Sequence, residues 1–190
     1  MKNYIYEYYQ KINDGSITVG KWIHLVYEYI IKGIENKKFV YDAKKANKAI
    51  NWIEEHCFHV EGPMAPSNFK LELWEKAFVS CVFGIVDPET NYRIFREVLL
   101  LIGRKNGKSI ISSCVANYVF QEDGGYGARV FNIAPKLDQA DIIYGNTWMM
   151  MQLDPEIIEK KQAIIDKRSQ SHERVEDDPT VPKKRMSDIY

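Results

Sequence analysis

The chain has 190 residues, 45% hydrophobic and 13% aromatic, which is enough to bury one sizeable core. Its 26 basic residues balance its 26 acidic residues, which excludes a global basic field that would attract nucleic acid or anionic lipid. Cys57, Cys81 and Cys114 are too far apart for a paired metal or redox motif, which favours a reducing compartment. No apolar run approaches the roughly 20 residues that span a bilayer, and the N-terminus lacks the apolar region of a signal peptide.

Residues 1–60 are predicted to form a small helical unit. A turn at 13–16 ends a short aromatic segment, and a helix follows because apolar residues recur at helical spacing. Its predicted apolar face comprises Trp22, Leu25, Val26, Tyr29 and Ile30, and it is widened by Ile23, Tyr27, Ile31 and Ile34. A second helix is expected to begin at an Asp42 cap, with an inner face of Ala46, Ala49, Ile50, Ile53 and Cys57. His56, Cys57 and His59 crowd its end too closely to converge on a metal ion.

A breaker-rich run at 61–68 is predicted to link this unit to a main domain at 69–155. That domain is expected to open with a helix from 69 to 83. A strand at 93–102, a helix at 107–120, a strand at 129–134 and a helix at 137–153 follow, and this alternation is typical of a parallel α/β sheet. Residues 156–190 are expected to form a charged solvated helix, a mobile segment and the beginning of a truncated strand.

The loop at 103–109 reads Gly-Arg-Lys-Asn-Gly-Lys-Ser and directly follows the apolar run 98–102. A strand that passes through a glycine turn into a helix N-terminus is an arrangement that binds phosphate. The general signature is G-x-x-x-x-G-K-[ST], but here Ile102 occupies the place of the first glycine and Gly103 comes one position later. The sequence therefore predicts a variant phosphate-binding loop in which Lys108 and Ser109 hold phosphate and magnesium.

Over essentially all 190 residues, the sequence resembles the large terminase subunit of tailed bacteriophages, specifically the N-terminal part of its packaging ATPase. The loop is similar to that family's variant phosphate loop, in which an arginine follows the first small residue. Residues 69–75 and 83–84 resemble the family's adenine-side segment, although Glu75 replaces the usual glutamine. Residues 134–140, which end in Gln139-Ala140, are similar to the family's second-strand segment.

This resemblance implies a partial P-loop NTPase parallel sheet with flanking helices, preceded by the small helical unit. It implies ATP and Mg²⁺ as cofactors, with Ser109 as the magnesium ligand. The implied nucleotide-binding residues are Gly103, Asn106, Gly107, Lys108 and Ser109 around the phosphates, and Trp74 and Glu75 beside the base. Lys108 would neutralise β- and γ-phosphate charge, and Arg104 would be a finger supplied within the chain. An alternative for Arg104 is a surface arginine that pairs with a carboxylate at the sheet edge.

The implied function is ATP binding and hydrolysis coupled to DNA translocation in a viral packaging motor. The implied partners are double-stranded DNA in the full-length protein, a small terminase subunit, a portal protein and further copies of the chain, with no membrane. The implied location is the cytoplasm of an infected bacterial host.

An apolar strand that ends in Asp-Glu, the Walker B element that orients magnesium and activates water, is not found in the 190 residues, nor is the family's nuclease domain. The sequence is therefore interpreted as a truncated large terminase whose ATPase activity alone is near background. Two alternatives stay open. One is a non-enzymatic interaction module that binds small terminase or portal through its helical N-terminal unit. The other is a small-molecule kinase, which the long segment before the loop disfavours.

Overall fold

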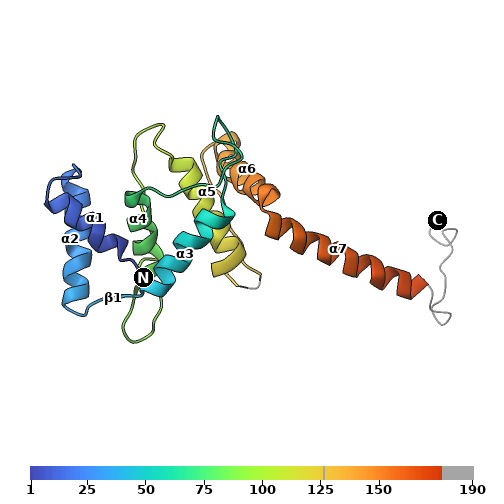
Figure 1. Cartoon of the computed structure of the whole chain (residues 1–190), viewed down its shortest axis with the longest axis horizontal. Helices are drawn as coiled ribbons and strands as arrows, with labels where there is room; N and C mark the ends of the chain where they lie inside the picture. Colours follow the sequence, from blue (N-terminus) through green and yellow to red (C-terminus); the bar gives the residue numbers. More distant parts are fainter. Residues whose placement is uncertain (126, 177–190) are drawn as a thin grey trace.

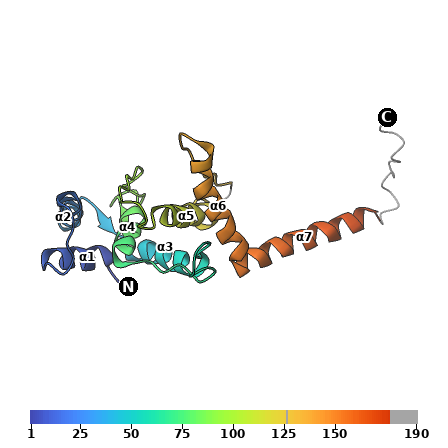
Figure 2. The same cartoon turned by 90° about the horizontal axis from the view of Figure 1, so that it is seen from above.

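The computed structural model describes residues 1–125 and 127–176, and this part of the chain is rich in helices. The α-helices are α1 (Tyr4–Asn13), α2 (Lys21–Glu35), α3 (Ala43–His56), α4 (Leu73–Gly84), α5 (Lys108–Tyr118), α6 (Leu137–Leu153) and α7 (Pro155–Glu176). A π-helical turn, η1 (Val119–Asp123), extends α5. Strands β1 (Val40–Tyr41) and β2 (Ile85–Val86) pair antiparallel. Helices α1 to α6 pack into one body from which α7 projects as an arm (Figures 1 and 2).

Helix α3 has the start and the buried face that the sequence predicts. The Asp42 side chain accepts hydrogen bonds from the N–H groups of Lys44 and Lys45, at 2.9 and 3.0 Å. An aspartate at this position satisfies N–H groups that the helix itself leaves without partners. The predicted inner residues are all fully buried: Ala46, Ala49, Ile50, Ile53 and Cys57.

Helix α2 forms as predicted, but the predicted apolar face was wrong in part. Trp22, Val26 and Tyr29 are 76%, 52% and 51% exposed, and Leu25 is also exposed. The buried residues are Tyr27, Ile30, Ile31 and Gly33, and the first three belong to the predicted apolar surface. Two contacts orient the helix this way: the ring of Tyr27 meets Tyr8 of α1 edge to face at 4.9 Å, and Gly33 lies directly against the Phe39 ring.

Helix α4 lies between the two halves of the core. Its Val79 and Phe83 pack with residues of α3 and α5, while its Ala77 packs with residues of α1 and α2. The helix begins at Leu73 and not at the predicted residue 69, because a reciprocal capping interaction between Glu72 and Glu75 fixes its first turn. Residues at the start of α4 are therefore held between the N-terminal helices and α5.

The segments predicted as strands, residues 93–102 and 129–134, form no strand in the described part of the chain. Arg93 makes an isolated bridge to Val86. In the described part of the chain, the one sheet is the two-stranded β1–β2 sheet. The apolar run 98–102, which the sequence predicts as a buried strand, is largely exposed: Val98, Leu99 and Leu101 are 49%, 81% and 82% exposed, whereas Leu100 packs against the core. A strand requires a neighbour for its backbone hydrogen bonds. The Ile94 N–H donates to the Ile85 carbonyl at 3.1 Å, but residues 98–102 and 129–134 donate no backbone hydrogen bond to another described residue. The parallel P-loop sheet is therefore not shown.

Helix α6 packs against α5 through hydroxyl groups at its centre. The Thr147 hydroxyl donates to the carbonyl of Ile143 at 2.8 Å, and the Ser113 hydroxyl of α5 donates to the same carbonyl at 3.2 Å. At the end of α6, the buried Asp154 side chain accepts from the Glu156 N–H at 2.9 Å and contacts His56 Nδ1 at 2.8 Å. These contacts fix the point from which α7 projects. The predicted mobile segment and strand beginning fall at 177–190, outside the described residues.

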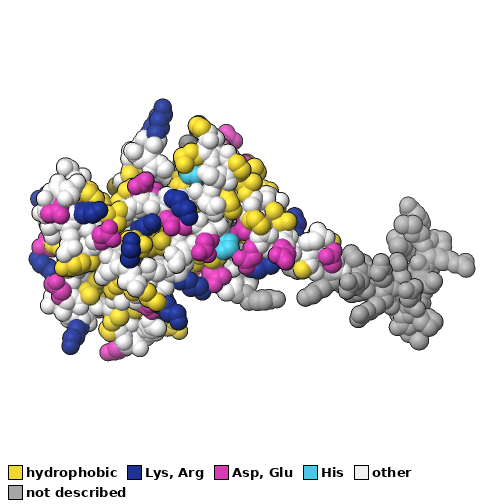
Figure 3. Space-filling view, in the orientation of Figure 1, with side chains coloured by type: hydrophobic (Ala, Val, Ile, Leu, Met, Phe, Trp, Pro, Cys, Tyr) yellow, Lys and Arg dark blue, Asp and Glu magenta, His cyan; other side chains and the backbone are white. Residues whose placement is uncertain are grey.

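No described helix has the length and apolar character to cross a bilayer. On the face drawn in Figure 3, basic and acidic side chains are interspersed, as expected for equal numbers of the two.

Candidate functional site

The loop at 103–107 leads directly into α5, whose first residue is Lys108. Gly107 precedes the helix with φ 72° and ψ 8°, in the left-handed region that glycine adopts without strain. No side chain caps this helix N-terminus. The N–H groups of its first turn are thus available to an anion, and the helix dipole favours negative charge there.

Three cationic side chains surround this helix end. Arg104, Lys105 and Lys108 are all exposed, and none of them forms an ion pair with another described side chain. Basic side chains project at this loop in the space-filling view (Figure 3). Unpaired cations beside an uncapped helix N-terminus attract anionic ligands.

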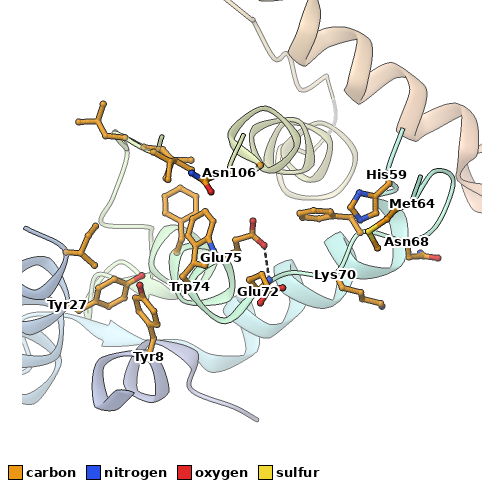
Figure 4. A pocket seen from close by; sticks show the side chains of 17 residues that line it. Tyr8, Tyr27, His59, Met64, Asn68, Lys70, Glu72, Trp74, Glu75 and Asn106 are labelled. Carbon is orange, nitrogen blue, oxygen red and sulfur yellow. Dashed lines mark hydrogen bonds between the residues drawn. The ribbon is translucent and has the colours of Figure 1, made fainter. Parts of the chain in front are cut away.

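A pocket of about 740 Å³ opens beside the loop. Its volume is within the range of sites that hold small organic ligands. Four parts of the chain contribute to its lining: Tyr8, Ile23 and Tyr27 from α1 and α2, Trp74, Glu75 and Phe78 from α4, residues of the 59–72 segment, and Leu100, Leu101, Ile102, Asn106 and Gly107 from the loop and the run before it. In Figure 4, Trp74 and Glu75 lie side by side from the first turn of α4, with Asn106 across from them.

Glu75 connects the start of α4 to the loop. Its Oε2 accepts the N–H of Glu72 at 2.8 Å, and a Cβ placed on Gly107 would lie 3.7 Å from its Oε1. The side chain is only 5% exposed. Burial raises the pKa of this carboxyl above its usual value, the hydrogen bond from the Glu72 backbone opposes the rise, and the Glu72 charge adds to it.

Ser109 and Asn106 complete the loop. Ser109 lies in the first turn of α5 and is partly buried, and its carbonyl accepts the hydroxyl of Ser113 at 2.9 Å. The side-chain amide of Asn106 folds back toward Gly103, so that a Cβ placed on Gly103 would lie 3.2 Å from Asn106 Nδ2. The loop is therefore compact at its centre while its cationic side chains point to solvent.

The structure brings Trp74 and Glu75 to the loop from about thirty positions earlier in the sequence. Gln139 and Ala140, which carry part of the terminase resemblance, lie in the first turn of α6 and do not line this pocket. The sequence reasoning did not assign Tyr8 and Tyr27 to the site. The one sequence signal for them was that they are aromatic. Residues that line a pocket and residues that fill a core recur at the same helical spacing, so the spacing could not assign these two tyrosines to the pocket.

A family model for the ATPase domain of the terminase large subunit matches residues 73–187, which is more than half of the chain. The chain belongs to the terminase large subunit ATPase family. No curated protein and no solved structure matches it. The terminase match includes Trp74, Glu75 and the whole of the loop. The pocket residues from α4 and from the loop therefore both lie within the matched region. Membership supports a packaging-motor ATPase role in general, with nucleotide and magnesium as ligands and DNA as a partner.

Proposed function

We propose that this chain binds ATP with Mg²⁺ in the pocket between α4 and the loop, as the nucleotide-binding part of a viral DNA-packaging motor. One observation carries the proposal: the pocket reaches Asn106 and Gly107 at the uncapped, cationic N-terminus of α5, inside the terminase match. The motor would act on double-stranded DNA in the host cytoplasm, with a small terminase subunit, a portal protein and further copies of the chain.

The chain's own residues fit a phosphate ligand. Lys108 would neutralise β- and γ-phosphate charge, and the N–H groups of residues 106–109 would cradle the phosphates. Gly103 and Gly107 would keep the loop tight enough for that contact. Arg104, exposed and without an ion pair among the described residues, would reach the γ-phosphate. These groups would hold and orient the ligand, and none of them is a base that could activate water.

The ligand's remaining contacts would come from Ser109 and α4. The Ser109 hydroxyl would be the protein's ligand to Mg²⁺, which takes oxygen ligands and retains several waters. Trp74 would offer a flat apolar surface to the base, and Glu75 would meet the ligand where the pocket joins the loop. The bound nucleotide and Mg²⁺ supply the phosphoryl group and most of the compensating positive charge.

We include in the proposal the parallel sheet of P-loop ATPases, to which residues 98–102 and 129–134 would contribute strands. The corresponding division is a helical unit at 1–60, a linker at 61–68, an ATPase part at 69–155 and a charged region at 156–190. The alternation of exposed and partly buried side chains from Leu99 to Ile102 supports this, because it is the pattern of a strand with one covered face.

Substitution of the loop lysine tests the proposed site. Lys108→Ala is expected to weaken ATP binding roughly tenfold to a hundredfold, because it removes a hydrogen-bonded charge from the phosphates. Isothermal titration of the 190-residue chain with ATP and Mg²⁺ measures this. Lys161→Ala, an exposed lysine on α7, removes the same charge far from the pocket and should leave binding unchanged. Equal affinity of wild type and Lys108→Ala would refute the proposed site.

A second candidate function is a non-enzymatic interaction module. The observation that favours it is the exposed stripe on α2, where Trp22, Val26 and Tyr29 follow one another about one turn apart. Such a stripe fits an apolar groove on a partner protein such as small terminase or portal. The same titration separates the two functions: an intact helical fold that binds no nucleotide supports the module.

A further inference from the structure

The buried carboxyl of Glu75 lies against the part of the loop that faces the proposed phosphates. Its Oε2 is occupied by the Glu72 N–H, whereas its Oε1, on the side of Gly107, accepts no hydrogen bond from a described residue. The sequence reasoning gave this residue only a place beside the base. The geometry gives it a second position, next to the helix end where anionic groups would bind.

The ionisable groups around Glu75 do not neutralise the negative charge of its carboxylate. The Glu72 carboxylate, at the same end of α4, raises the pKa of Glu75. Across the core on α5 lies the Cys114 thiol, whose pKa burial raises well above its usual value, so that it carries no charge at neutral pH. Lys76 of α4 pairs with Glu54 of α3 at 3.1 Å.

The other ionisable groups nearby come from the 59–72 segment and from the loop. His59 and Lys70 line the same pocket, and the Lys70 ammonium donates to the carbonyl of Glu54. Arg104, Lys105 and Lys108 are exposed and are oriented to solvent. A negative Glu75 would therefore face the phosphates without a cation of its own.

We propose that Glu75 lowers the affinity of the loop for phosphate groups, and that neutralising its carboxyl tightens the binding of nucleoside di- and triphosphates. This inference rests on the proposed nucleotide site. Two charges about 10 Å apart at an effective dielectric constant of about 20 change an affinity by roughly tenfold. Burial already favours the neutral carboxyl, and a bound anion favours it further. The neutral form predominates below the pKa and binds tightly, and the charged form above it binds weakly.

Glu75→Gln is the decisive variant because its amide oxygen can still accept the Glu72 N–H while the charge is removed. ATP and ADP affinities are measured by calorimetry without Mg²⁺, from about pH 5 to pH 8. The variant is expected to bind roughly tenfold more tightly at the upper end, and the two proteins should converge as the pH falls. Protonation of the ligand is common to both proteins, so the ratio of their affinities reports Glu75. Glu97 is exposed, precedes the loop in the sequence and does not line the pocket, so Glu97→Gln should match wild type.

A second measurement compares proton uptake in wild type and in Glu75→Gln. Titrations of wild type in buffers of different ionisation enthalpy should show net proton uptake on ATP binding near the pKa of Glu75. Uptake that is lost in Glu75→Gln identifies this carboxyl, whereas uptake that persists in the variant comes from another group, such as His59, which lines the same pocket.

Several results would overturn the inference. One is wild-type binding that depends on Lys108 but is unchanged or weakened by Glu75→Gln at pH 8. Another is net proton release by wild type at every pH. A third is an ATP affinity that Glu75→Gln lowers only when Mg²⁺ is present, which would mean that the carboxylate binds the cation. Absence of ATP binding by folded wild type and by Glu75→Gln alike would instead refute the nucleotide site itself, and this inference with it.

Discussion

Two helical glycines show how single residues constrain this chain. A Cβ on Gly33 of α2 would overlap the ring of Phe39, which is itself 4% exposed and lies 5.6 Å from the Tyr29 ring. A Cβ on Gly145 of α6 would meet nothing within 4 Å. The first glycine is required by packing, whereas the second only lowers helix propensity.

Gly33→Ala is therefore expected to destabilise the chain by about 1–3 kcal/mol, because the added methyl group must displace a buried ring. The matched substitution Gly145→Ala should stabilise it by about 0.5–1 kcal/mol, since alanine restricts the unfolded chain and favours the helix. Urea unfolding followed by circular dichroism measures both. A neutral Gly33→Ala would mean that Phe39 does not pack against α2.

At the scale of elements, the helices differ in how far their own sequence determines where they begin and which face they bury. The start of α3 is predictable because an aspartate cap and the next turn are local features. The buried face of α2 is not, because apolar residues surround the helix and contacts with Tyr8 and Phe39 select which ones are covered. The loop and the start of α5 are likewise local, while the arrival of Tyr8, Tyr27 and Glu75 at the same pocket depends on how α1, α2 and α4 pack.

The corrected face of α2 predicts opposite outcomes for two large residues. Ile30→Ala should cost about 2–5 kcal/mol, because Ile30 is 2% exposed and its loss leaves a cavity. Trp22→Ala should change stability by no more than about 0.5 kcal/mol, because Trp22 is 76% exposed. Thermal and urea unfolding of the two variants check this. A large cost for Trp22→Ala would restore the face predicted from the sequence.

At the scale of the whole molecule, the pocket, the loop and the start of α5 form the proposed phosphate site, and the histidine and carboxylate side chains that line the pocket are His59, Glu72 and Glu75. We expect Lys108, Arg104 and Ser109 to bind charge. The loop and α5 contain no carboxylate, and of the two carboxyls that line the pocket, Glu75 is buried and accepts the backbone N–H of Glu72. Strand pairing was the part of the fold that the sequence did not determine, because the apolar pattern at 98–102 predicts a strand but does not specify a neighbour for it, and this segment forms no strand.

The 190-residue chain is accordingly expected to hydrolyse ATP near background, even with Mg²⁺ and double-stranded DNA. Phosphate release measured over hours, with Lys108→Ala as the reference for background, tests this. Turnover well above that reference would show that the chain contains an activating group that neither the sequence nor the site geometry identifies.

The segments 98–102 and 129–134 have a further consequence for the exchange of amide hydrogens with solvent. None of their N–H groups donates a hydrogen bond to another described residue, so deuterium should replace these hydrogens nearly as fast as in an unfolded chain. The buried turns of α3 at Ile50 and Ile53 should exchange far more slowly. Mass spectrometry of peptides from these regions makes the comparison. Slow exchange at 98–102 would mean that the amides leading into the loop have partners, as they would in a sheet.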